Sequence, residues 1–181
     1  MMRVMTLAHR LATEADLPAL DALMARAIAE LQHGLLSREQ IAVSHKVMGL
    51  DRPLVADRTY FIALAGGEVA GCGGWSWRAT LFGGDDSIVA RDPRRLDPAS
   101  EAAKVRAMYT DPAQARKGVG AYVLALCEGA AREAGFARAE LMATLSGARL
   151  YRKAGYVVAE AVESAAVDGV TVPLLRMEKA L

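Results

Sequence analysis

The stretch KVRAMYTDPAQARKGVG, residues 104–120, decides the fold of this protein. Side chains alternate along residues 104–110, with Val105, Ala107 and Tyr109 on one face, and this pattern predicts a β-strand with one covered face. The other predicted face consists of Lys104, Arg106 and Met108. An Asp-Pro pair ends the strand, and a glycine-bearing turn leads into a helix. The stretch therefore predicts a strand, a turn and a helix in direct succession.

The turn at Arg116–Gly120 has the chemistry of an anion site. The first N–H groups of a helix have no partner within it, and the positive end of the helix dipole lies at the same point. Glycine keeps side chains away from a bound phosphate, and Arg116 and Lys117 add positive charge. These features suit a pyrophosphate better than a carboxylate. On the residues alone, a tight turn that binds no ligand is equally consistent.

Other phosphate motifs are excluded. The dinucleotide fingerprint GxGxxG fails because Val123 stands where its third glycine belongs. A phosphate-binding loop of the GxxxxGK[ST] type does not occur in the chain. The pattern thus favours a phosphate-binding turn of another kind.

Helices and strands are predicted on both sides of this stretch. Before it, apolar spacing and capping residues predict helices at about 17–31 and 38–48, and a hairpin of strands 59–64 and 68–72. Residues 81–100 are rich in turn-forming residues and predict a surface insertion. After the helix, the pattern predicts strand 139–143, helix 148–153, and strands 156–162 and 170–177. Strands and helices alternate in a way that indicates a mixed α/β protein.

Length and composition exclude several classes of protein. The chain has 181 residues, 53% of them hydrophobic, and a formal net charge of +1, which predicts one domain over residues 1–181. Apolar runs are far shorter than the roughly 20 residues of a membrane-spanning helix, and a near-neutral chain has no overall attraction to nucleic acid or anionic lipid. We expect a cytoplasmic protein without nucleic-acid or membrane partners. In it, Cys72 and Cys127 would be buried, reduced thiols, and no metal would be bound.

Segments of the chain resemble the Gcn5-related N-acetyltransferase (GNAT) family. Residues 115–120, ARKGVG, are similar to the family's loop Q/R-x-x-G-x-G/A, except that Ala115 stands at its first position. Residues 150–156, LYRKAGY, are similar to the family's L-Y-x-x-x-G-F. The hairpin 60–75 and the ending 172–177 are also family-like, so the resemblance covers nearly the whole chain. It implies an α/β (α+β) fold with a mixed, mostly antiparallel central sheet, flanking helices and splayed central strands.

The resemblance also implies acetyl-CoA or another acyl-CoA as cosubstrate. Its pyrophosphate would be held by the backbone N–H groups of Arg116, Lys117, Gly118, Val119 and Gly120. The backbone of Met108, Tyr109 and Thr110 would pair with the pantetheine arm like an additional strand. A backbone N–H near Met108 or Tyr109 would polarise the thioester carbonyl, and Tyr151 would protonate the leaving thiolate. The implied activity is transfer of an acetyl group to a primary amine by direct attack in a ternary complex.

The general base stays open at the level of sequence. A lysine-like amine must lose a proton before it attacks, at a cost of roughly 4–5 kcal/mol at neutral pH. The central strand holds no acid, although some relatives use a glutamate there. Glu101, Glu140 and His45 are candidates, but each is more simply interpreted as a solvated or structural residue.

The acceptor site is equally open. Arg106 would suit a substrate carboxylate, but an internal ion pair is the simpler interpretation. Trp75 and Trp77 suit either an acceptor pocket or the core. Tyr156 follows the glycine of the second motif and is interpreted as a packing residue. The acceptor itself is a small-molecule or peptide amine of unspecified kind.

Another class of function remains open beside the enzyme. A non-catalytic CoA-binding sensor or interaction module of the same fold is favoured by the missing strand acid and by Ala115, and opposed by Tyr151. An edge strand near the C-terminus would also suit pairing in a homodimer.

Overall fold

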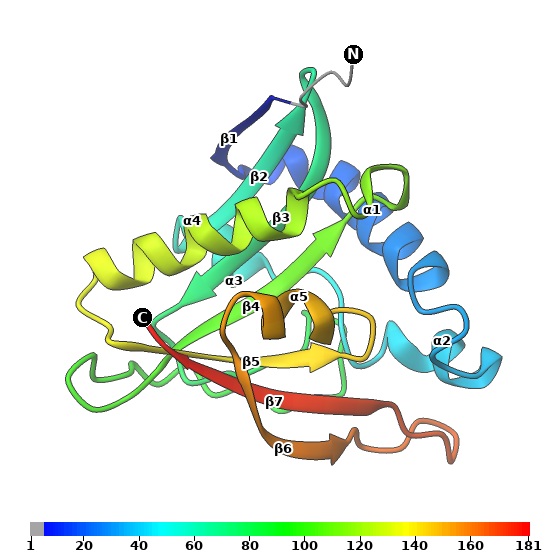
Figure 1. The fold of residues 1–181 in the computed structure, drawn as a ribbon. Helices are drawn as coiled ribbons and strands as arrows, with labels where there is room; N and C mark the ends of the chain where they lie inside the picture. Colours follow the sequence, from blue (N-terminus) through cyan, green and yellow to red (C-terminus); the bar gives the residue numbers. More distant parts are fainter. Residues whose placement is uncertain (1–5) are drawn as a thin grey trace.

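The computed structural model describes residues 6–181, which form a seven-stranded sheet with helices on both faces (Figure 1). The strands are β1 (Leu7–Leu11), β2 (Tyr60–Ala65), β3 (Glu68–Ser76), β4 (Ala103–Thr110), β5 (Arg138–Thr144), β6 (Val157–Glu163) and β7 (Pro173–Ala180). The helices are α1 (Leu17–Glu30), α2 (Arg38–Ser44), α3 (Arg52–Ala56), α4 (Val119–Glu133) and α5 (Ala148–Lys153), with short 3-10 turns η1 (Glu14–Asp16) and η2 (Pro112–Gln114). Within residues 6–181, no helix combines the length and the apolar character needed to cross a membrane.

The sheet opens at its centre. Its strand order is β1-β2-β3-β4-β5-β7-β6, and all neighbouring strands are antiparallel except β4 and β5. These parallel strands pair only at Ala103–Ala139 and Lys104–Glu140, and beyond that point they diverge (Figure 1). The last pair is reinforced by a hydrogen bond of 2.5 Å from Lys104 Nζ to Glu140 Oε2. The predicted mixed, mostly antiparallel sheet with splayed central strands is therefore confirmed.

Strand β4 is covered on both faces, so the predicted single covered face is wrong. Val105 and Met108 pack in the cluster that contains α4, whereas Ala107 and Tyr109 pack in the cluster that contains α1. The predicted alternation fails after Arg106 because Ala107 has a φ of +50° and lies where the pairing of β3 with β4 shifts register. Such a β-bulge inserts an extra residue, and the side chains that follow exchange faces.

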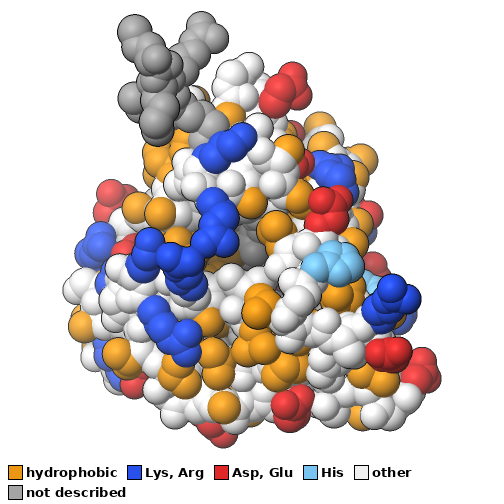
Figure 2. Space-filling model, turned by 45° about the vertical axis from the view of Figure 1, so that its right-hand side comes forward, with side chains coloured by type: hydrophobic (Ala, Val, Ile, Leu, Met, Phe, Trp, Pro, Cys, Tyr) orange, Lys and Arg blue, Asp and Glu red, His pale blue; other side chains and the backbone are white. Residues whose placement is uncertain are grey.

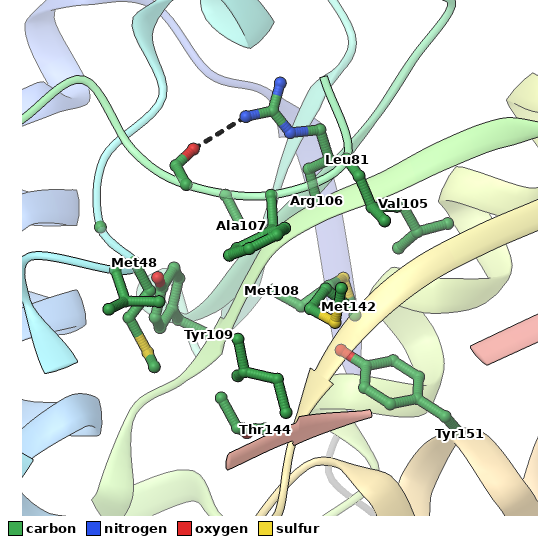
Figure 3. Close-up of a pocket in the computed structure, with 15 residues that line it drawn as sticks. Met48, Leu81, Val105, Arg106, Ala107, Met108, Tyr109, Met142, Thr144 and Tyr151 are labelled. Carbon is green, nitrogen blue, oxygen red and sulfur yellow. Dashed lines mark hydrogen bonds between the residues drawn. The ribbon is translucent and has the colours of Figure 1, made fainter. Parts of the chain in front are cut away.

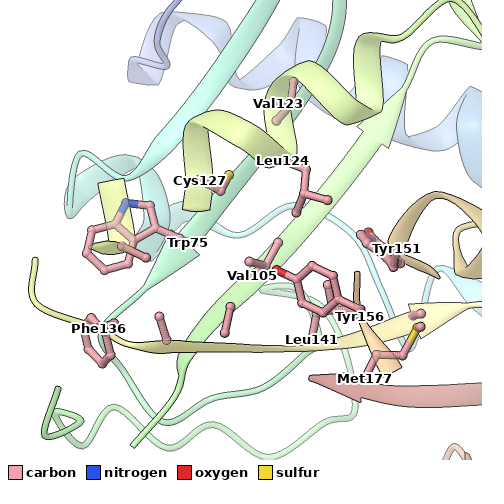
Figure 4. Packing of buried hydrophobic residues seen from close by; sticks show 14 of the residues in the cluster. Trp75, Val105, Val123, Leu124, Cys127, Phe136, Leu141, Tyr151, Tyr156 and Met177 are labelled. Carbon is pink, nitrogen blue, oxygen red and sulfur yellow. The ribbon is translucent and has the colours of Figure 1, made fainter. Parts of the chain in front are cut away.

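The larger cluster lies between α4 and the sheet (Figure 4). The indole of Trp75 packs edge to face against Phe136, with ring centroids 6.0 Å apart, and against Trp77, at 5.5 Å. Neither tryptophan lines the cavity described below, so they belong to the core and its border. Tyr156 is 2% exposed, and its role as a packing residue is confirmed.

Both cysteines are buried, free thiols, as predicted. Burial raises the pKa of the Cys72 thiol to about 12, and it also raises the pKa of Cys127. Both thiols are therefore protonated at neutral pH and unreactive.

The element boundaries differ from prediction in a few places. The second helix begins at its predicted capping box, where the Gln40 N–H donates to Ser37 Oγ over 3.1 Å, but it ends at Ser44. Strand β1 and helix α3 were not predicted. Each covers only 5 residues, and β1 is an edge strand whose middle residues are exposed, so neither leaves a clear hydrophobic period in the sequence.

Candidate active site

The opening between β4 and β5 contains a cavity of about 80 Å³ (Figure 3). Its walls come from the segment after α2, from the insertion between β3 and β4, and from β4, β5, α5 and β7. Apolar side chains cover most of these walls, including Met48, Leu81, Phe82, Val105, Met142 and Leu174. Hydroxyl groups come from Tyr109, Thr144 and Tyr151. The diverging strands thus form an apolar cavity with a few polar tips.

Tyr151 presents its hydroxyl group to this cavity. The side chain is carried by the short helix α5 and is 7% exposed. Its phenol oxygen points toward the side chain of Met142 on β5 (Figure 3). Burial raises the pKa of the Tyr151 phenol above its ordinary value. The phenol is therefore protonated at neutral pH, and its proton is available to a ligand.

The turn before α4 presents a row of backbone donors. Gly118 is the N-cap of α4 with a φ of +87°, and Arg116 also has a positive φ, of 62°. Among residues 6–181, the N–H groups of Arg116, Lys117 and Gly118 have no backbone acceptor. Those of Val119 and Gly120 belong to the first turn of α4, where N–H groups have no partner within the helix. The turn has the donors and the dipole of an anion site.

The same turn is open to ligands. Arg116, Lys117 and Gly118 are exposed, and nothing lies within 4 Å of the position a Gly118 Cβ would take. Figure 2 shows a hollow on the side where β4 and β5 end, with Lys and Arg side chains along one border and hydrophobic side chains along another. Among residues 6–181, nothing covers Gly118 at the tip of this turn.

The C-terminal half of β4 has one free edge. On one side, Tyr109 pairs with Cys72 of β3 and Thr110 pairs with Gly71 of β3. Met108 directly precedes these two residues of β4. Pairing with β5 has already ended at the start of β4, so the other side faces the opening. This edge of the strand can pair with an extended ligand.

Helix α5 and the turn are in direct contact. A Cβ at Gly120 would lie 2.8 Å from Leu150 Cδ2, so a larger residue at this position would have to displace the Leu150 side chain. Leu150 directly precedes Tyr151. The contact therefore places the turn next to α5, whereas Tyr151 and residues 108–109 of β4 line the cavity itself.

Arg106 does not serve as a free anchor for a carboxylate. Its guanidinium Nη2 lies 2.6 Å from Asp51 Oδ2 and donates a hydrogen bond of 2.8 Å to the Gly83 carbonyl oxygen (Figure 3). Asp51 Oδ2 accepts no hydrogen bond among residues 6–181, so this contact is an ion pair. Arg91 Nη1 approaches the other Asp51 oxygen at 3.1 Å. The simpler of the sequence interpretations, an internal ion pair, is the one observed.

None of the candidate bases lines the cavity. Glu101 accepts hydrogen bonds from Arg94 that lower its pKa to about 2. Glu140 is held by Lys104 and by Arg176, whose Nη1 lies 2.9 Å away. His45 is an exposed residue at the end of α2. The structure brings these three residues to places where they have other partners or face solvent.

The individual residues of the wall opposite the turn could not be predicted from the sequence. Residues 47–49 and 81–83, together with Met142 and Leu174, line the cavity although they are far apart in the chain. The bulge at Ala107 was missed as well, and its carbonyl oxygen accepts a hydrogen bond of 2.8 Å from Tyr60 Oη. No residue pattern signals either feature, because both depend on which distant segments meet.

The family of the protein follows from its sequence. The model of the family described as "Acetyltransferase (GNAT) family" matches residues 25–156, which is more than half of the chain. The protein therefore belongs to the GNAT acetyltransferase family, and the resemblance seen in its motifs is confirmed. No curated protein sequence matches the chain.

Solved structures share the fold at low sequence identity. A GCN5-related N-acetyltransferase of Rhodopseudomonas palustris is 20% identical with a TM-score of 0.70, and the match covers 100% of this chain and 99% of that one. The ribosomal-protein-alanine N-acetyltransferase of Brucella melitensis is 21% identical with a TM-score of 0.64, covering 96% and 99%. The PaiA N-acetyltransferase of Thermoplasma acidophilum, in complex with coenzyme A, is 17% identical with a TM-score of 0.60, covering 98% and 100%.

Proposed function

We propose that this protein transfers an acetyl group from acetyl-CoA to a primary amine, by direct attack of the amine in a ternary complex. The supporting observation is that three features lie in or next to one opening in the sheet. They are the unpaired N–H groups of the turn 116–120, the free edge of β4 at 108–110, and the buried, protonated phenol of Tyr151. A protein that only bound CoA would have no need of the third feature.

The turn and the strand edge suit the different parts of acetyl-CoA. The N–H groups of Arg116 to Gly120 would bind the pyrophosphate, with the side chains of Arg116 and Lys117 adding positive charge. The backbone of Met108, Tyr109 and Thr110 would pair with the amides of the pantetheine arm. A structurally similar GNAT protein from Thermoplasma acidophilum has coenzyme A bound, which supports this choice of cosubstrate.

In the proposed chemistry, the protein supplies donors rather than a covalent nucleophile. The amine nitrogen attacks the thioester carbonyl carbon, and a backbone N–H near Met108 or Tyr109 stabilises the negative charge that develops on the carbonyl oxygen. As the carbon–sulfur bond breaks, Tyr151 donates its proton to the sulfur, and the second proton of the attacking nitrogen is lost as the amide forms and restores the Tyr151 phenol. Cys72 and Cys127 are buried thiols with raised pKa values and do not line the cavity, so a covalent acetyl-cysteine is disfavoured.

The proton of the amine has no protein acceptor at the cavity. Of residues 6–181, no carboxylate or histidine lines it. An amine that enters an apolar cavity without an anionic partner has a lowered pKa, because burial disfavours the charged form. The acceptor would therefore give up its proton to solvent as it enters.

A thiol-release assay tests this proposal. Acetyl-CoA and a panel of primary amines are incubated with the protein, free CoA is measured with a thiol reagent, and mass spectrometry identifies the acetylated amine. We expect equimolar CoA and N-acetyl product, with no acetylated enzyme. Tight CoA binding by calorimetry without release on any amine would instead indicate a sensor or interaction module.

A further inference from the structure

The cavity between β4 and β5 has no free charge on its walls. Among the described residues that line it, Arg106 alone carries a formal charge. The remaining side chains are apolar or carry hydroxyl groups. Among the described residues, a ligand that enters this cavity therefore meets no carboxylate, and the cation that it meets, Arg106, is ion-paired, although its Nε has no hydrogen-bond partner.

The charge of Arg106 is already neutralised. Its side chain is 3% exposed and that of Asp51 is 1% exposed, and their charged atoms are 2.6 Å apart. The guanidinium also donates to the Gly83 carbonyl oxygen, which fixes the insertion as one wall of the cavity. A second arginine, Arg91, pairs with Asp51 and with Asp85 from the outer side. A substrate carboxylate would have to displace Asp51 from this buried network.

A charged group on the acceptor would be costly in such a cavity. Moving an ammonium or a carboxylate from water to an apolar site without a partner is strongly unfavourable. An alkyl or aryl group gains from burial against the same walls. We infer that the acceptor is a small primary amine with an uncharged, apolar body, and that polyamines and free amino acids are poor acceptors. This inference rests on the proposed function.

Three amines of similar length test the inference. Pentylamine and 1,4-diaminobutane differ only in a terminal methyl group against a terminal ammonium group, and 4-aminobutanoate ends in a carboxylate. We expect kcat/KM for pentylamine to exceed the value for either charged amine by about 100-fold or more. A value for either charged amine equal to or above that for pentylamine would overturn the inference.

A pair of variants tests whether the cavity wall sets this preference. Met48→Glu puts a carboxylate on the wall, and we expect it to reduce the preference for pentylamine over 1,4-diaminobutane by about 10-fold. Ile88→Glu is the matched control. Ile88 is 48% exposed, it does not line the cavity, and its N–H donates to the Lys46 carbonyl oxygen close by. An equal change in both variants, or no change in Met48→Glu, would contradict the assignment of this wall.

A binding measurement separates the inference from the proposed function. Each amine is titrated into the CoA-bound protein by calorimetry. Binding of pentylamine alone, without any thiol release, would refute the transferase and support the apolar acceptor site. Release with 1,4-diaminobutane or 4-aminobutanoate as the best acceptor would support the transferase and refute the apolar site. If none of the three amines binds and none causes thiol release, both the transferase and the apolar acceptor site are refuted.

Discussion

The opening between β4 and β5 has two sides that are built by different means. The side formed by the turn 116–120 and the edge of β4 uses backbone groups from one continuous stretch of chain. The opposite side uses side chains from residues 47–49, 81–83 and Met142, which distant segments bring together. Backbone donors recognise what all substrates of one kind share, such as a pyrophosphate, whereas side-chain walls are free to vary. The difference explains why the side proposed to bind the cosubstrate has a readable motif and the side proposed to bind the acceptor has none.

The largest expected effect comes from breaking the buried ion pair behind the acceptor side. Asp51→Asn leaves the 3%-exposed side chain of Arg106 without its counter-charge, and removing one partner of such a pair costs about 3 kcal/mol in the free energy of unfolding. Urea denaturation measures this loss. Because the pair fixes Gly83 on the acceptor side only, KM for the amine should rise while the Kd for CoA stays within about twofold.

Asp57→Asn is the control for this variant. Its partner Arg78 is 36% exposed, and exposed ion pairs contribute at most about 1 kcal/mol. Equal losses of stability in the two variants would contradict the distinction between the buried and the exposed pair. A selective loss of CoA binding in Asp51→Asn would contradict the separation of the two sides.

The next largest effect concerns the phenol where the two sides meet. Tyr151→Phe should lower kcat by about 100-fold, because the leaving thiolate loses its proton donor, while CoA affinity changes by less than about twofold. Steady-state kinetics and calorimetry measure these quantities separately. Tyr156→Phe removes another buried phenol, one with no hydrogen-bond partner among residues 6–181, and should leave kcat near the wild-type value. Equal kinetics of Tyr151→Phe and the wild type would rule out the acid role.

A smaller effect is expected at the turn. Gly118 has a φ of +87° and open space around it, and both Asn and Asp tolerate this conformation better than other residues do. Gly118→Asp and Gly118→Asn have nearly the same shape, so their comparison isolates the charge. We expect Gly118→Asp to bind CoA about 10-fold more weakly than Gly118→Asn by calorimetry, because a carboxylate repels the pyrophosphate. Identical CoA affinities of the two variants would contradict the assignment of the pyrophosphate site to this turn.

The smallest effect concerns the end of the opening where β4 and β5 still pair, and where Glu140 accepts a hydrogen bond from Lys104. Burial by itself would raise the pKa of Glu140, but Lys104 and Arg176 outweigh it and hold this pKa below its ordinary value. A carboxyl with a lowered pKa stabilises the fold above its unfolded-state pKa of about 4.3, and this contribution is lost as the pH falls through the folded-state pKa. Glu140→Gln should therefore cost about 1 kcal/mol near pH 7 and show a shallower loss of stability below about pH 5. Parallel pH profiles for the two proteins would argue against this ion pair.

The sequence predicted the features that depend on local patterns. The strand, turn and helix of residues 104–133 and the capping box at Ser37 were found because their signals are contiguous. The bulge at Ala107 was missed because alanine gives no sign of a positive φ. An internal ion pair was expected for Arg106, but its partner Asp51 was not identified because the two residues are far apart in the chain. Acceptor specificity depends on such distant contacts, which is why the structure was needed to infer it.

A crystal structure with acetyl-CoA bound tests the central claim most directly. The claim predicts pyrophosphate oxygens within hydrogen-bonding distance of the N–H groups at 116–120, pantetheine along the free edge of β4, and the thioester sulfur beside the Tyr151 hydroxyl. A cosubstrate bound elsewhere on the protein, with the turn and the opening free of ligand, would contradict it.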